Sequence, residues 1–561
     1  MSFSVRYTPA VLFTLFSLAV TLSAQSPNTQ PGKAPRGSVS GRVTIKDKGA
    51  AGVAVGLRKS EINPFEQHLR ATTDQDGFYR IANVPAGSYE VGPSVPAFIL
   101  ANDNNNQRGK TVVVGEEEHV EGINFSLIRG GVITGKVTDA DGRPVIQQQV
   151  SLFMAETFNQ PQREPGRMIF ATQQVPTDDR GIYRMYGLRA GKYKVGTGRG
   201  EDSYMAGYNE NRTSYKQVFH PDVSDQAKAT IIEVSEGSEA TNVDIKLGPA
   251  LQTFSVSGRV IEAERGLPVA NIHFTLQRFS GQRPAEFINS SLTSNVQGEF
   301  YTEGLIPGRY QIYLFQEMNA DLRADTVSFE ITDQDVSDVT VRLTKGASLS
   351  GVIVFESEDK AAHQKLLQMR LRAQVAPKPG GPQYFGQSTM APISPDGSFR
   401  LGGLPSGTAN VVLTSAMGVF FTKGFTISRI ERDGVIMRGV EVKDGEQVSG
   451  LRVFVAYGNG SIRGVVKLEN GTLPEGAQMF VRLTKPGEPP PALRPSAVDA
   501  RGHFLMEGIP PGNYEVVVQV FSGSRTPLRT AKREVTVQDG IVTDVMLTVD
   551  LTPPPTPTPK P

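Results

Sequence analysis

Short runs of alternating apolar and polar residues, separated by turns rich in glycine and proline, recur along most of the chain. In residues 514–518, for example, Tyr514, Val516 and Val518 occupy every second position, and Glu515 lies between the first two. Side chains at every second position share one face of a β-strand, so such a run predicts a strand with one buried face. The chain as a whole therefore predicts an all-β fold of many short strands.

The pattern repeats five times around a glycine that opens a strand. These glycines are Gly77, Gly181, Gly298, Gly397 and Gly502. Two positions later stand the aromatic residues Tyr79, Tyr183, Phe300, Phe399 and Phe504. Ten positions later stand Gly87, Gly191, Gly308, Gly407 and Gly512. Five copies without an insertion or deletion in this stretch establish an internal repeat.

Each copy has a simple physical interpretation. The first glycine tolerates a positive φ in the turn, and the aromatic residue packs into a core. Twelve positions after that glycine come Tyr89, Tyr193, Tyr310, Ala409 and Tyr514. The tyrosines resemble a tyrosine corner, in which the ring is buried and the hydroxyl bonds to the backbone. Ala409 breaks this pattern in the fourth copy.

The repeats also share a beginning and an end. Each starts with a glycine in a predicted strand, and these glycines are Gly41, Gly135, Gly258, Gly351 and Gly464. Each ends in two strands that we expect to pair, such as 112–114 with 123–127 in the first copy. About seven short strands per copy predict a β-sandwich of two sheets, large enough to fold without disulfides.

These features divide the chain into five tandem β-sandwich domains. The predicted boundaries are 37–129, 130–250 with an insertion, 251–346, 347–457 and 458–551. Because the connections between domains are short, we expect the domains to lie end to end. Strands of six to ten residues would then give a rod on the order of 150 to 200 Å.

The two ends of the chain differ in character from the repeats. Residues 1–24 combine Arg6, an apolar stretch and small residues before Gln25, which predicts a cleaved signal peptide, with an uncleaved anchor as the alternative. Residues 25–36 form a polar lead-in, and residues 552–561 a proline-rich tail. No later segment is apolar enough to cross a membrane. We therefore expect an extracytoplasmic protein: periplasmic, cell-surface or secreted.

Composition narrows the possible functions. The 58 Lys and Arg residues balance 57 Asp and Glu residues, so the charge gives no reason to expect a nucleic-acid partner. The chain contains no cysteine, which excludes disulfides, thiolate metal sites and a cysteine nucleophile. It also contains no tryptophan, so any sugar-stacking ring must belong to tyrosine or phenylalanine.

The opening Ser-Gly-Arg-Val, the Asp-Gly-x-aromatic turn and the following Leu-Pro-x-Gly-x-Tyr-x-Val resemble the carboxypeptidase regulatory-like family. That family has a transthyretin-like (prealbumin-like) sandwich, classed with carbohydrate-binding-like folds and similar to Cna B-type domains. The resemblance extends over residues 37–549. It implies a non-catalytic accessory module of exported bacterial proteins, and fold alone does not fix the activity.

Motifs for catalysis, cofactors or metals are weak, and we predict no residue for any of these roles. Residues 130–136 lack the Ser or Thr that a phosphate-binding loop needs next. Asp74 and Asp139 begin calcium-loop-like turns, but hairpin turns explain them better. The six histidines have no ligand spacing. Lys46 and Asn124 lie roughly where a Cna B-type isopeptide pair would lie, although we favour ordinary strand positions.

Carbohydrate binding therefore depends on aromatic residues outside the repeat pattern. Variable segments of the second and fourth domains contain such residues, namely Tyr204, Tyr208, Tyr215, Phe219, Tyr384 and Phe385. Loops that vary on a fixed scaffold are frequent binding sites. The preferred hypothesis is a non-catalytic protein that binds a polysaccharide or cell-surface glycan. The alternative is a structural spacer or adhesin-like stalk with a cell-surface protein as its partner.

Overall fold

The computed structural model describes residues 36–59, 68–101, 109–155, 171–199, 214–280, 283–314, 321–375, 388–416, 423–474, 476–485, 495–522 and 527–552. The expected signal peptide, almost all of the lead-in and all of the tail after Thr552 lie outside these residues. Within them, no helix is both long and apolar enough to cross a membrane.

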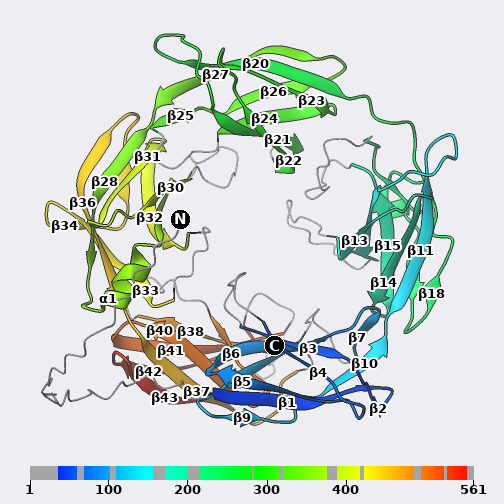
Figure 1. Ribbon diagram of the computed structural model, residues 1–561, viewed down its shortest axis with the longest axis vertical. Coiled ribbons are helices and arrows are strands. Elements are labelled where there is room, and N and C mark those ends of the chain that lie inside the picture. The colour runs from blue at the N-terminus through cyan, green and yellow to red at the C-terminus, as the bar shows by residue number, and fades with distance from the viewer. Residues whose placement is uncertain are drawn as a thin grey trace, which may run out of the picture.

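Five β-sandwich domains follow one another along the chain (Figure 1). Domain 1 contains β1 (Arg36–Ile45), β2 (Lys48–Gly49), β3 (Ala54–Lys59), β4 (Leu69–Thr72), β5 (Phe78–Pro85), β6 (Gly87–Ser94), β7 (Phe98–Leu100), β8 (Lys110–Val114), β9 (His119–Val120) and β10 (Phe125–Arg129). Domain 2 contains β11 (Gly131–Thr138), β12 (Gln149–Met154), β13 (Gln173–Pro176), β14 (Ile182–Leu188), β15 (Gly191–Thr197), β16 (Val218–Phe219), a 3-10 turn (Gln226–Lys228), β17 (Ile232–Val234), β18 (Glu239–Ala240) and β19 (Ile245–Lys246).

The other three domains have the same plan. Domain 3 contains β20 (Phe254–Glu262), β21 (His273–Ser280), β22 (Arg283–Thr293), β23 (Glu299–Leu305), β24 (Gly308–Leu314), β25 (Leu322–Ala324), β26 (Val327–Ile331) and β27 (Val336–Lys345). Domain 4 contains β28 (Ala347–Phe355), α1 (Lys360–Leu366), β29 (Arg370–Val375), β30 (Ser388–Pro392), β31 (Ser398–Leu404), β32 (Gly407–Thr414), β33 (Phe425–Arg432), β34 (Val435–Met437), β35 (Val440–Val442) and β36 (Gln447–Tyr457). Domain 5 contains β37 (Gly460–Glu469), β38 (Gln478–Thr484), β39 (Ser496–Ala497), β40 (His503–Ile509), β41 (Gly512–Phe521), β42 (Arg529–Val537) and β43 (Val542–Asp550).

One sheet topology recurs in all five domains. In the first sheet, the opening strand lies between the strand after the turn glycine and the last strand, and it runs parallel to the last strand. The second sheet is antiparallel, with the order β4-β3-β6-β8 in domain 1. The two strands that close each domain were expected to pair with each other, and this is wrong. In domain 1, β8 pairs with β6 in one sheet, whereas β10 pairs with β1 in the other.

The core of each domain is formed by the residues that the repeat singles out. The aromatic residue after the turn glycine is at most 5% exposed in every domain. The turn glycines themselves have φ between +71° and +83°, a region that L-residues with side chains rarely adopt. Each domain has its own main apolar cluster, and the predicted all-β fold of tandem sandwiches is confirmed. Domain 4 also contains the helix α1, which the sequence analysis did not predict. Its buried residues are Ala362 and Leu366.

The predicted tyrosine corner is present in the four domains that contain the tyrosine. In each of them the hydroxyl donates to the backbone carbonyl four residues upstream. The bonds are Tyr89 to Pro85 (2.8 Å), Tyr193 to Arg189 (3.0 Å), Tyr310 to Ile306 (2.6 Å) and Tyr514 to Pro510 (2.9 Å). The corner thus ties the tight turn to the strand that follows it.

Loss of this bond should be measurable in domain 3, where Tyr310 is fully buried. We expect Tyr310→Phe to lower the free energy of unfolding of this domain by about 1 to 2 kcal/mol, because a buried carbonyl loses its donor. Hydrogen exchange of domain 3 amides measures the loss. Tyr301→Phe in the same domain is the control, since Tyr301 is 59% exposed. Equal exchange in both variants would contradict the prediction.

The domains form a closed ring and not the expected rod (Figure 1). The connections between them are short, as predicted, and backbone hydrogen bonds of glycines lie at or beside three of them. These bonds are Gly130 N–H to the Ala97 carbonyl (2.9 Å), Gly346 N–H to the Asp321 carbonyl (2.7 Å) and Gly458 N–H to the Gly424 carbonyl (2.9 Å). Because successive domains bend in the same sense, domain 5 returns to domain 1.

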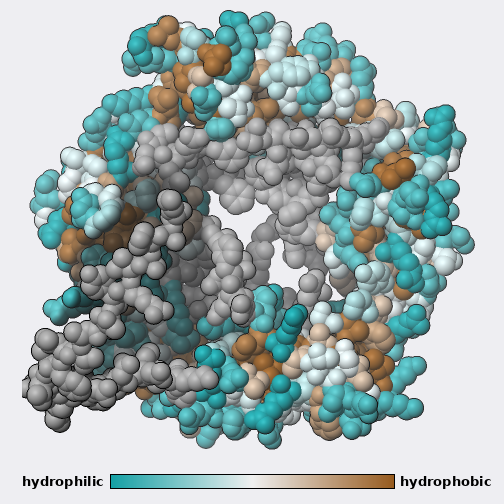
Figure 2. Space-filling view, viewed as in Figure 1, coloured by the Kyte–Doolittle hydropathy of each residue, from teal (hydrophilic) through white to brown (hydrophobic). Residues whose placement is uncertain are grey.

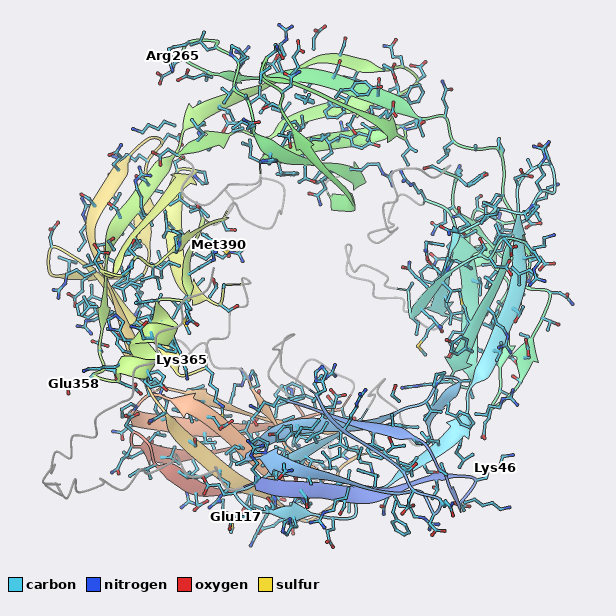
Figure 3. The ribbon with its side chains drawn as sticks, viewed as in Figure 1. Lys46, Glu117, Arg265, Glu358, Lys365 and Met390 are labelled. Carbon is cyan, nitrogen blue, oxygen red and sulfur yellow. The ribbon has the colours of Figure 1, made fainter. Side chains whose placement is uncertain are left out.

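The ring has an inner and an outer side. Figure 1 shows the second sheets, with β3, β13, β21 and β30, on the inner side, and β1, β11, β20 and β28 on the outer side. Met390 of β30 accordingly lies on the inner side in Figure 3, while Lys46, Arg265 and Glu358 lie on the outer side. Figure 2 shows an opening at the centre of the ring.

Candidate functional site

The aromatic residues predicted to bind sugar have two different outcomes. Tyr204, Tyr208, Tyr384 and Phe385 lie outside the described residues. Tyr215 and Phe219 are buried, with 9% and 2% exposure, so their faces cannot pack on a sugar ring.

The burial of these two residues has a local cause. The insertion that follows β15 ends in β16. This strand pairs with β15 and places Phe219 opposite Gly196. Phe219 then packs against Phe153, with ring centroids 6.0 Å apart, while Tyr215 joins the main core of domain 2. The apolar residues at this end of the insertion thus anchor it to domain 2, and neither ring is exposed.

The calcium-like turns are hairpin turns in which the first acidic residue caps the backbone. Asp74 Oδ1 accepts from the N–H groups of Asp76 (3.0 Å) and Phe78 (2.8 Å), and Asp139 caps its own turn in the same way. Among the residues that the structure describes, no group of His, Asp or Glu could hold a metal ion.

The Lys46 and Asn124 pair also has an ordinary structural role. Asn124 Oδ1 accepts from the Arg42 N–H at 2.8 Å, which joins the last strand of domain 1 to its first. Lys46 is exposed, in the turn after β1. Asp244 accepts from the Lys136 N–H at 2.8 Å in domain 2, so this is a repeated strand contact.

The groups whose pKa departs from its ordinary value also belong to the scaffold. The Ile182 N–H holds the pKa of Asp178 below its usual range, and burial raises the pKa of the Tyr79 and Tyr183 hydroxyls. The hydroxyl of Thr552, together with other hydrogen bonds, lowers the pKa of Asp550 to about 2. Turn caps, strand contacts and buried rings account for all of these shifts.

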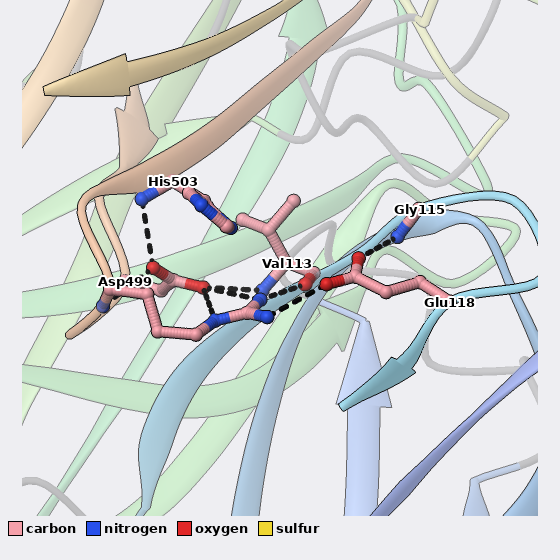
Figure 4. Close-up of polar contacts among 6 residues, drawn as sticks. Val113, Gly115, Glu118, Asp499 and His503 are labelled. Carbon is pink, nitrogen blue, oxygen red and sulfur yellow. Dashed lines mark hydrogen bonds and ion pairs between the residues drawn. The ribbon is translucent and has the colours of Figure 1, made fainter. Parts of the chain in front are cut away.

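A site that the sequence analysis missed lies where domain 5 meets domain 1 (Figure 4). Its residues are Asp499 and Arg501 in the turn before β40, and Val113 and Glu118 around β8; we call it the closure contact. The Val113 N–H donates to Asp499 Oδ2 (3.2 Å), and Arg501 Nη2 donates to the Val113 carbonyl (2.5 Å). Arg501 Nη1 also donates to Glu118 Oε1 at 2.7 Å.

The two carboxylates of the contact, Asp499 and Glu118, are each held in place by hydrogen bonds from their own domain. Asp499 Oδ1 accepts from the N–H groups of Arg501 (2.9 Å) and His503 (2.8 Å), so the same carboxylate caps the turn. Glu118 Oε2 accepts from the Gly115 N–H at 2.6 Å. Burial alone would raise the pKa of Glu118, but the bonds from Gly115 and Arg501 outweigh it and lower the pKa.

A cleft of about 570 Å³ lies beside the closure contact, between the turn after β8 and the first sheet of domain 5. Its walls carry both signs of charge, but these charges are largely paired. Arg463 Nε donates to Asp544 Oδ1 at 2.8 Å, and Glu118 bonds to Arg501. Charged side chains that already bond to each other are better suited to polar contacts between two surfaces than to proton transfer in a reaction.

The sequence contains only a partial signal for this site. Asp499 and Arg501 stand three and one positions before the turn glycine, and domain 2 has Asp178 and Arg180 at the same two positions. A comparison of the repeats therefore finds the charged turn, but it does not show which copy contacts another domain.

Comparison with known proteins supports the domain fold. Residues 37–121, which belong to domain 1, match the family model of the second β-sandwich domain of BOS complex subunit NOMO1-like proteins. The protein is a tandem array of prealbumin-like, Ig-like β-sandwich domains. No curated protein matches the chain.

The solved structures to which this chain is similar include two pilins and the TIE protein. A streptococcal ancillary pilin is 13% identical, with 55% of this chain and 99% of that chain covered and a TM-score of 0.24. The TIE protein of Bacillus anthracis is 15% identical, with 72% and 69% covered and a TM-score of 0.16. The minor pilin GBS52 of Streptococcus agalactiae is 13% identical, with 38% and 100% covered and a TM-score of 0.19.

Proposed function

We propose that this protein is an exported, non-enzymatic binding scaffold, whose variable loops bind a polysaccharide or a cell-surface glycan outside the cytoplasm. One observation carries the proposal. The five domains share their sheets but differ in the connection between the first two strands of the second sheet. Loops that vary on a constant framework are where binding residues tend to lie.

The length of this connection differs widely between domains. Its flanking residues are Lys59 and Leu69, Met154 and Gln173, Ser280 and Arg283, Val375 and Ser388, and Thr484 and Ser496, in chain order. The strands that flank it are on the inner side of the ring in domains 1 to 4 (Figure 1). Tyr384 and Phe385 belong to the domain 4 connection, and Tyr204 and Tyr208 to the segment between β15 and β16.

The proposal is tested by retention of residues 25–561 on a panel of soluble and insoluble polysaccharides, with free oligosaccharide as competitor. We expect Tyr204→Ala with Tyr208→Ala, or Tyr384→Ala with Phe385→Ala, to weaken retention about tenfold, because each pair removes rings that stack on sugar.

Exposed aromatic residues on the outer sheets provide the matched control. Tyr186→Ala and Tyr301→Ala remove rings that are 45% and 59% exposed and should leave retention unchanged. Failure of the folded protein to bind any polysaccharide would overturn the glycan proposal. The alternative of a structural spacer or adhesin-like protein with a protein partner would then take its place.

A further inference from the structure

The ring is closed by a contact between residues that are very distant in the sequence. Val113 and Asp499, which bond directly, are 386 positions apart. Each of the other four pairs of neighbouring domains is connected by the chain itself. Closure of the ring therefore depends on non-covalent interactions between domain 1 and domain 5.

Domain 5 binds an exposed strand edge of domain 1. β8 is the edge strand of the sheet β4-β3-β6-β8. An edge strand leaves alternate N–H and C=O groups without a partner in the sheet, and such groups readily pair with another chain. Asp499 accepts from the Val113 N–H and Arg501 donates to the Val113 carbonyl, so one charged turn satisfies both groups.

The same charged turn forms without a docked domain elsewhere in the chain. In domain 2, Arg180 Nη2 lies 3.2 Å from Asp178 Oδ2, and their side chains are 73% and 39% exposed. In the closure contact, Arg501 and Asp499 are 32% and 2% exposed. The pairing of carboxylate and guanidinium is therefore a property of the turn itself. When domain 5 docks on domain 1, it covers a charged surface that the turn already presents.

The two surfaces of the closure contact are different from each other. A contact between unlike surfaces can form within one chain or between two chains. The geometry of the molecule decides whether such contacts close a ring. The contact is also charged and lies beside the 570 Å³ cleft, so its packing is incomplete. Both properties favour a contact that opens and closes.

We propose that the closure contact is a reversible interface, which closes the ring within one chain and, once opened, joins the same two surfaces of two copies of this chain. The tether between domains 1 and 5 gives an effective concentration on the order of millimolar. At micromolar concentration the closed single-chain ring therefore predominates, and a second copy binds only when closure within the chain is blocked.

Charge reversal separates closure within a chain from pairing between chains. Arg501→Glu and Glu118→Arg each place like charges opposite one another, so each single variant should open. Opening into an extended array should raise the radius of gyration by roughly a third, as measured by small-angle X-ray scattering at low salt. The double variant restores opposite charges between positions 118 and 501 but not the bond to the Val113 carbonyl, so its radius of gyration should fall below that of either single variant.

Mixing the two single variants tests for the second copy. Each chain then carries one surface that complements the other chain, and two such contacts can close a two-chain ring. We expect light scattering to show about twice the monomer mass in the mixture, but not in either variant alone, at concentrations on the order of 0.1 mM. Arg180→Glu, which reverses the equivalent charge in domain 2, is the matched control and should remain compact.

Three results would overturn the proposal or part of it. Single variants with the wild-type radius of gyration would show that the contact does not hold the ring closed. Single variants that expand but do not associate when mixed would exclude the second copy as a partner. If a reversed variant fails to fold, Arg501→Gln and Glu118→Gln remove the charge with less disturbance, and an unchanged radius of gyration in both would reject the proposal. None of these outcomes depends on glycan binding.

Discussion

Gly41→Ala should lower the free energy of unfolding of domain 1 by about 3 kcal/mol, because the backbone just before the last strand of the domain leaves no space for a side chain there. A Cβ atom at Gly41 would lie 2.1 Å from the Ile123 carbonyl oxygen and 2.5 Å from its carbon. Both are backbone atoms beside the paired strands β1 and β10, so neither moves without disturbing the parallel pairing. Hydrogen exchange of domain 1 amides in the full-length chain measures the loss.

A second glycine in a strand of domain 1 provides the control. A Cβ atom at Gly56 on β3 would meet nothing closer than the Gly92 carbonyl oxygen, at 4.0 Å. Gly56→Ala should therefore be neutral, or stabilising by about 0.5 kcal/mol through the unfolded chain. Equal losses in the two variants would show that glycine matters at Gly41 for a reason other than close approach.

The same close approach explains why every repeat begins with a glycine. A Cβ atom at the opening glycine would lie 1.9 to 2.1 Å from a carbonyl oxygen in the last strand or just before it in domains 1 to 4. In domain 5, the Cβ of Gly464 would first meet the ring of Phe504 at 2.2 Å. The repeat alignment identified these positions, but only the parallel pairing of first and last strands gives the reason.

The domain fold was largely predictable because its signals are local. The turn glycines, the buried aromatic residues and the tyrosine corners each depend on residues close together in the sequence, and each occurs in several copies. The alternation of Tyr514, Val516 and Val518 similarly predicted a strand whose three inward residues are at most 2% exposed.

The arrangement of the domains could not be predicted in the same way. The sequence shows that the connections are short, but it does not show in which direction one domain bends from the next, and contacts such as the bond from Gly130 to Ala97 are visible only in the structure. The closure contact joins two segments almost 400 residues apart through polar groups that look like ordinary surface residues. The burial of Phe219 depends likewise on the pairing of β16 with β15 across the intervening segment, which the local sequence pattern does not show.

Asp499→Ala should have the other large effect, because one carboxylate stabilises both the turn of domain 5 and the closure contact. Its side chain is 2% exposed and accepts from Arg501, His503 and Val113. Removing it leaves the Arg501 guanidinium partly buried without this partner and the Val113 N–H without an acceptor. We expect a loss of about 3 kcal/mol, the usual cost of breaking a buried ion pair.

Asp178→Ala separates the two roles of this carboxylate. Asp178 caps the equivalent turn of domain 2 through the N–H groups of Arg180 and Ile182, but it is 39% exposed, so water replaces part of what is lost. We expect a loss of about 1 kcal/mol in domain 2. The decisive measurement is exchange of the Val113 amide, which should accelerate in Asp499→Ala and stay slow in Asp178→Ala. Unchanged protection of Val113 in both variants would mean that domain 5 does not dock on β8 in solution, and the ring would then be only one of the arrangements open to five tethered domains.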